Sequence, residues 1–88
     1  MKLDPEFLLQ QVGSQSLLVP IGGAGERFHG VIQLNETAAF LVRCLQQETD
    51  EAGMMAALSR EYDGTPDQFR RSIEKTVSTL RQAGALIE

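Results

Sequence analysis

The stretch GVIQLNET, residues 30–37, marks the point at which the chain changes from one kind of secondary structure to another. In its first half, Ile32 and Leu34 fall on one face of an alternating pattern, which predicts a strand over residues 30–34. Asn35 is a favourable helix N-cap, and an acidic residue follows it in the first turn, where the helix dipole favours an anion. We therefore expect a sheet before this point and helices after it.

Two short runs before this stretch have the composition of strands. They are Phe7–Val12 and Ser16–Pro20, and the Gly-containing link between them has the length of a hairpin loop. Pro20 has no N–H to give to a ladder, so we expect it at a strand end or a sheet edge. The Gly-rich segment 21–28 is expected to form a flexible tip without regular structure.

Two helices with apolar faces are expected between Asn35 and Gly64. The first repeats apolar side chains at helical spacing on two strips, with Ala38, Leu41, Val42 and Leu45 on one and Phe40 and Cys44 on the other. We therefore expect it to be buried on more than one side. The second opens at Thr49 or Asp50, and Gly53 inside it suggests a close contact with another helix.

The segment Thr65–Gln68 is the clearest local signal in the chain. Its threonine suits the N-cap, its proline suits the first helical position, and its glutamine completes a capping box. The apolar face of this third helix holds Phe69, Ile73, Thr76 or Val77, and Leu80. We expect the helix to end before Gly84, with Leu86 and Ile87 folding back onto the core.

Size and charge restrict the possible functions. A chain of 88 residues that is 42% hydrophobic has room for one domain, residues 1–88, with one modest core. Its net charge of −4 counts against binding nucleic acid or an anionic membrane over its whole surface. The single cysteine favours a reducing cytoplasm, no apolar run reaches the roughly 18 residues of a membrane span, and the charged N-terminus does not have the pattern of a signal peptide.

Neither a catalytic site nor a metal site is expected. His29 has no second imidazole to join it, and the chain has one thiol, so a metal site is not supported. A Cys44–His29 pair would lack an orienting third group, and Cys44 is interpreted as a small hydrophobe. The glycines of segment 22–25 do not follow the spacing of a phosphate-binding loop. We predict a protein that is not an enzyme and carries no cofactor.

Several of these stretches resemble the PqqD-like family, also called the RiPP recognition element, whose founding member serves pyrroloquinoline quinone biosynthesis. The resemblance covers about residues 7–88 and is carried by Leu18–Gly22, Phe28–Ala38, Glu61–Asp63 and Ala83–Glu88. It implies an α+β winged helix-turn-helix, in which a three-stranded antiparallel sheet is followed by three helices. It also implies that the leader region of a ribosomally synthesised precursor peptide adds as a further strand beside the third strand and lies over the third helix. The implied role is that of a non-catalytic adaptor that presents the peptide to a radical-SAM or other peptide-modifying enzyme.

The residues themselves suggest how such a surface would work. An open strand edge offers unpaired N–H and C=O groups to an extended peptide, and a cleft against the third helix offers side-chain pockets. The predicted peptide-binding residues are Val31, Ile32, Gln33, Leu34, Phe69, Arg70, Ile73, Glu74, Val77 and Arg81. Arg70 and Arg81 are expected to meet acidic leader side chains at the rim of the cleft, whereas Arg71 and Lys75 are expected to point elsewhere.

Two functions of other classes are also compatible with the sequence. The four basic residues of the third helix would allow a winged helix that binds DNA, although such domains usually carry positive charge across several elements. The other function is that of a structural protein–protein interaction module, which would pair through exposed strand edges. A monomer or weak dimer is expected in solution.

Overall fold

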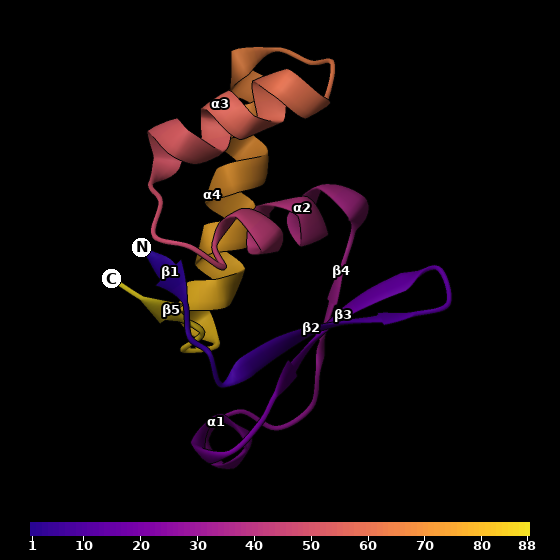
Figure 1. The fold of residues 1–88 in the computed structure, drawn as a ribbon, viewed down its shortest axis with the longest axis vertical. Coiled ribbons are helices and arrows are strands. Elements are labelled where there is room, and N and C mark those ends of the chain that lie inside the picture. Colours follow the sequence, from indigo (N-terminus) through magenta and orange to yellow (C-terminus); the bar gives the residue numbers. More distant parts are fainter.

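The computed structural model describes all 88 residues (Figure 1). In chain order, its elements are β1 (Lys2–Leu3), β2 (Phe7–Val12), β3 (Gln15–Pro20), α1 (Gly23–Arg27), β4 (Ile32–Leu34), α2 (Glu36–Cys44), α3 (Glu51–Glu61), α4 (Pro66–Gln82) and β5 (Leu86–Ile87). Strands β2, β3 and β4 form one antiparallel sheet, and α2, α3 and α4 follow it. The predicted α+β winged helix-turn-helix is therefore confirmed, and β1, β5 and α1 are additions to the predicted plan.

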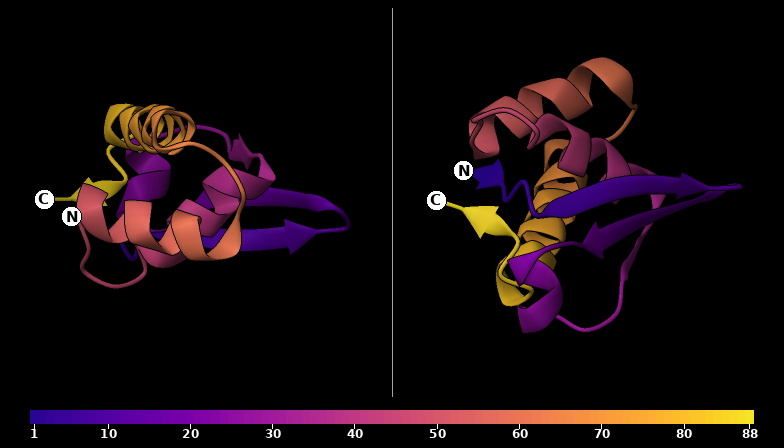
Figure 2. Two further views of the ribbon diagram at one scale, coloured as in Figure 1. Left: turned by 90° about the horizontal axis from the view of Figure 1, so that it is seen from above. Right: turned by 60° about the horizontal axis from the view of Figure 1, so that its bottom comes forward.

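The three-stranded sheet has the order β2-β3-β4, so each outer strand has one free edge. Phe7 pairs with Pro20, which ends β3 as its missing N–H requires. Leu18 pairs with Ile32 and Ser16 with Leu34, which fixes β4 against the middle of the sheet. The β2–β3 hairpin projects beyond the helices (Figure 2).

The Gly-rich segment after β3 is helical, which corrects the prediction of a flexible tip. The N–H of Gly23 donates to Glu6 Oε2 at 2.9 Å, so a side chain just before β2 satisfies one N–H in the first turn of α1. Gly22 precedes the helix with a φ of 55°, and Ala24 is fully buried. A partner 17 residues away, invisible to local patterns, therefore orders this segment.

The two ends of the chain form a second, small sheet. Lys2 pairs with Ile87, and Leu3 pairs with Leu86. Leu3 is buried, and its N–H donates to the Leu45 carbonyl at 2.8 Å. The predicted return of the C-terminus to the core holds for Leu86, which packs against it, but Ile87 is 48% exposed and contributes mainly its backbone.

The helix starts follow the predicted caps. Asn35 accepts the N–H of Ala38 at 2.7 Å, and Asp50 accepts the N–H of Gly53 at 2.8 Å. Thr65 forms both hydrogen bonds of the predicted capping box. The prediction that Gly53 contacts another helix is wrong. A Cβ at this position would first meet Thr49 and Asp50, at the start of its own helix, and no atom of another helix is as near.

One apolar core joins the sheet to the helices. Leu18 and Leu34 supply it from the sheet, while α2, α3 and α4 supply Leu41, Val42, Met54, Leu58, Ile73, Val77 and Leu80. Phe40 and Cys44 are half-buried against the core, so α2 is packed on more than one side, as predicted. The helix α4 ends with Gly84 at a φ of 71°, the left-handed backbone that favours glycine. None of the helices is both long and apolar enough to span a membrane.

Candidate functional site

A groove of about 760 Å³ separates β4 from α4. From the sheet side it is lined by Ile32, Gln33, Leu34, Asn35, Thr37 and Ala38, and from α4 by Gln68, Arg71, Ser72, Lys75, Thr76, Thr79 and Leu80. The two elements run along the same axis in opposite chain directions (Figure 1), and they lie on the same side of the molecule (Figure 2, left). The groove is therefore an elongated channel with a strand on one wall and a helix on the other.

The strand wall of the groove is an open sheet edge. β4 pairs with β3 alone, and none of the backbone hydrogen bonds outside helices and strands involves residues 31–34. Successive residues of a strand direct their N–H and C=O groups to opposite sides, so part of this backbone faces the groove without a partner. An extended peptide laid against β4 would complete the ladder.

The helix wall is polar and positively charged. The lining residues of α4 recur at intervals of three or four, which makes them one continuous stripe beside the buried face. Arg71 and Lys75 are the charged members of this stripe, and both are exposed and form no ion pair. Ile32, Leu34, Ala38 and Leu80 give the groove an apolar floor.

The predicted orientation of α4 is wrong. We expected Arg70 and Arg81 at the rim of the cleft, with Arg71 and Lys75 elsewhere, but it is Arg71 and Lys75 that line the groove. Of the predicted binding residues, Ile32, Gln33 and Leu34 line it, and Val31 lies next to them, 52% exposed. Phe69 and Ile73 are buried in the core, behind the groove wall.

The opposite flank of α4 belongs to a different part of the surface. Glu74, Val77 and Arg81, together with Ile73, line a smaller pocket of about 250 Å³ whose other side is Met1, Glu51 and Met54. The 3.6-residue period identified the buried stripe of α4 but did not reveal which of its two flanks faces β4. That choice depends on the position of the strand across the fold.

Two cations of α4 outside the groove are held by carboxylates of the chain itself. Arg70 Nη1 donates to Asp67 Oδ1 at 2.8 Å. Arg81 donates to both carboxylate oxygens of Glu88, at 2.6 Å and 2.9 Å. These hydrogen bonds from Arg81 lower the pKa of the Glu88 carboxyl and raise the pKa of Arg81. Both cations are thus partly neutralised, in contrast to Arg71 and Lys75.

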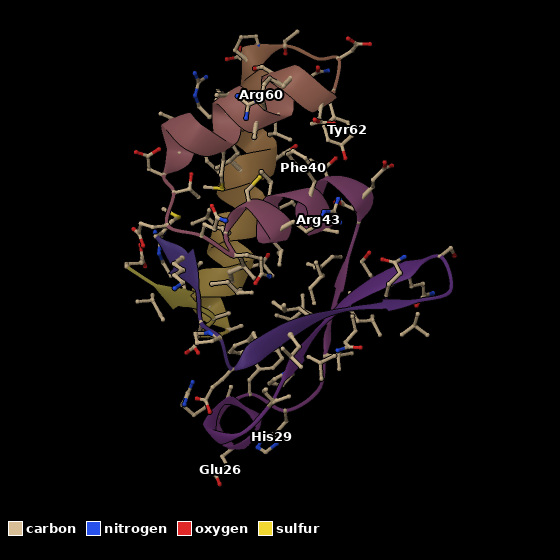
Figure 3. All side chains as sticks on the ribbon, in the orientation of Figure 1. Glu26, His29, Phe40, Arg43, Arg60 and Tyr62 are labelled. Atoms are coloured by element: carbon tan, nitrogen blue, oxygen red, sulfur yellow. The ribbon has the colours of Figure 1, made fainter.

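The side chains considered for catalysis are not brought together. His29 lies beside α1 (Figure 3), whereas Cys44 is the last residue of α2. Burial raises the pKa of the Cys44 thiol, against the opposing influence of Arg43 and Arg60. Phe40 stacks edge-on with Tyr62 where α2 meets α3, with Arg43 over the Phe40 ring. No three His, Cys, Asp or Glu side chains gather in a group able to hold a metal ion.

Comparison with known proteins agrees with this geometry. The family model described as "Coenzyme PQQ synthesis protein D (PqqD)" matches residues 8–86. The chain belongs to the PqqD family. The match includes both walls of the groove, β4 and α4, and leaves out the first seven residues, which carry β1. No curated protein matches this PqqD family member.

Two solved structures resemble this PqqD family member over nearly its whole length. One is described as a lasso peptide synthetase B1 complexed with the leader peptide; it is 28% identical, has a TM-score of 0.74, and the match covers 99% of this chain and 96% of that one. The other is TbiB1 in complex with the TbiA(beta) leader peptide, with a TM-score of 0.76 and coverage of 98% and 94%. At 13% identity, the second shows likeness of fold alone.

Proposed function

We propose that this PqqD family member is a non-catalytic adaptor that binds the leader segment of a ribosomally synthesised precursor peptide in the groove between β4 and α4. The carrying observation is that the free edge of β4 forms one wall of that groove. The 28% identical lasso peptide synthetase B1, solved with a leader peptide, supports the same role. A radical-SAM or other peptide-modifying enzyme in the cytoplasm would receive the bound peptide.

Strand addition explains binding but not selectivity. β4 has three residues, so a guest strand would form about two to four backbone hydrogen bonds, each contributing about 0.5–1.5 kcal/mol. Micromolar affinity corresponds to a binding free energy of about 8 kcal/mol, which these hydrogen bonds alone do not supply. They are also available to any peptide sequence. Side chains of the guest must therefore supply the remaining free energy and the discrimination.

The floor of the groove has the apolar surface for this purpose. Ile32, Ala38 and Leu80 line it, and Ile32 and Ala38 are half-buried in the free protein. One or two apolar side chains of the leader buried there would contribute about 1.5–3 kcal/mol each, against about 2–5 kcal/mol for ordering the free leader. The balance favours moderate affinity, which suits an adaptor that must release its peptide.

Within this proposal, the predicted site residues divide into three groups. Ile32, Gln33 and Leu34 offer the strand edge, with Val31 as its extension. Phe69 and Ile73 hold α4 in place from the core side. Arg70, Glu74, Val77 and Arg81 were predicted to bind the peptide, but we assign the α4 side of the groove to the stripe from Gln68 to Thr79.

Isothermal titration tests the proposal directly. The probe is the leader half of the precursor peptide encoded beside this chain, titrated into the 88-residue protein. We expect saturable one-to-one binding at micromolar or somewhat tighter affinity. Absence of saturable binding at concentrations a hundredfold above this range would reject the adaptor role.

A further inference from the structure

The charges inside the groove are all of one sign. Of the thirteen residues that line it, two are charged, Arg71 and Lys75, and both are cations. This is unexpected in a chain with twelve acidic residues and a net charge of −4. None of the five ion pairs in the protein includes either side chain, so both the guanidinium and the ammonium group are free to meet a ligand.

No carboxylate of the protein lies within ion-pair distance of these two cations. Asp67, on the same helix, is held by Arg70 at 2.8 Å, and Glu74 lines the smaller pocket on the opposite flank. The remaining basic residue of α4, Arg81, is held by Glu88. The helix thus has one flank whose cations are satisfied within the protein and one flank, facing β4, whose cations are not.

We propose that Arg71 and Lys75 make the groove selective for leader segments that carry carboxylate side chains at two alternate positions. This inference depends on the adaptor role and specifies the chemistry of the peptide. Residues i and i+4 of a helix are about 6 Å apart along its axis. Alternate residues of a strand, which point to the same side, are about 6.5–7 Å apart. A guest strand on β4, running beside α4, therefore presents side chains i and i+2 to Arg71 and Lys75 nearly in register.

The two cations can attract an acidic peptide even though the protein as a whole carries a net negative charge. Single-sign charge inside a groove attracts the opposite charge over about 10 Å at ordinary ionic strength, while the net −4 charge acts weakly at that range. Ion pairs between exposed groups are modest, so we expect each carboxylate to improve the dissociation constant about two- to fivefold. Apolar side chains on the floor of the groove retain most of the affinity.

A displayed library of random twelve-residue segments tests this selectivity and does not require the sequence of the precursor. The wild-type protein should enrich segments with Asp or Glu at two positions spaced i, i+2. The double substitution Arg71→Gln/Lys75→Gln should still enrich segments but lose the acidic preference. Arg71→Glu/Lys75→Glu should select Lys or Arg at the same two positions.

Arg60→Glu is the matched control. Arg60 is an exposed cation without an ion pair, but it lies on α3 outside the groove, so its substitution should leave the acidic preference unchanged. Circular dichroism checks that each variant is folded. The proposed selectivity would be overturned if the wild-type protein enriched segments without an acidic preference. It would also be overturned if the acidic preference survived in Arg71→Gln/Lys75→Gln. Failure of the folded wild type to enrich any segment would instead reject the adaptor role itself.

Discussion

At the scale of single residues, short hydrogen bonds fix where the elements begin. Thr65 and Gln68 each accept one backbone N–H at the start of α4, at 3.1 Å and 2.9 Å. Such patterns act over three residues, so they were predictable from the sequence. The hydrogen bond from the Gly23 N–H to Glu6 also satisfies a backbone donor at a helix start, but its two partners are 17 residues apart. Local sequence patterns do not reach that far, so they do not predict α1.

Thr65→Ala removes the side-chain oxygen that accepts the Gln68 N–H. We expect the free energy of unfolding to fall by about 1 kcal/mol, within a range of about 0.5–2, because α4 loses one of its capped donors. Urea denaturation followed by circular dichroism measures the change. Ser78→Ala, at an exposed position in the middle of α4, is the control and should change stability by about 0.5 kcal/mol or less. Equal effects of the two substitutions would contradict the capping role.

The Arg81–Glu88 pair should make a small contribution to stability that depends on pH. The folded-state pKa of Glu88 lies below its ordinary value of 4.5, so its contribution is present above pH 4.5 and is lost as pH falls through the lowered value. Glu88→Gln should therefore be slightly less stable than the wild type at neutral pH. The difference should vanish at strongly acidic pH. Thermal unfolding measured from neutral to strongly acidic pH tests this, and a difference that grows on acidification would contradict it.

At the scale of elements, the orientation of α4 separates what the sequence could predict from what it could not. Phe69, Ile73 and Leu80 recur at helical spacing, so the buried face of α4 was predictable. Arg70 and Arg71 are both exposed, and no local pattern decides which of them faces β4. The same limit applies to β1 and β5, because strands of two residues acquire their conformation from each other.

Val31→Pro tests the use of the strand edge. Val31 is exposed, immediately precedes β4, and takes part in no backbone hydrogen bond outside helices and strands. Proline there removes an N–H that could serve a guest strand, and we expect affinity for the leader probe to fall about threefold to tenfold, as for one hydrogen bond. Val31→Ala, which keeps the N–H, should bind nearly as well as the wild type. Undiminished affinity in a folded proline variant would count against strand addition at this end of β4.

At the scale of the whole molecule, the distribution of charge separates peptide binding from DNA binding. The net charge is −4, and two of the four cations of α4 are held by Asp67 and Glu88. The charged residues that line the groove, Arg71 and Lys75, both come from α4, whereas domains that bind duplex DNA usually carry positive charge across several elements. The remaining two cations of α4, Arg71 and Lys75, form no ion pair and line the groove against β4.

We accordingly expect no specific affinity for duplex DNA. A fluorescently labelled duplex of about two helical turns, titrated with the protein at about 50 mM salt, should show no saturable change in anisotropy. The leader probe, labelled in the same way, is the positive control. Saturable binding to the duplex that weakens steeply with added salt would favour a winged-helix DNA-binding protein instead.

The sheet has two free edges, on β2 and on β4, and a guest strand could pair with either. Backbone amide chemical shifts show most directly which edge the leader peptide binds. The ¹⁵N-labelled protein is titrated with the leader probe and followed by NMR. We predict large shifts for Ile32–Leu34 and for the stripe of α4 from Arg71 to Thr79, with little change along β2. Shifts confined to Phe7–Val12, or to helices α2 and α3, would contradict the assignment of the groove.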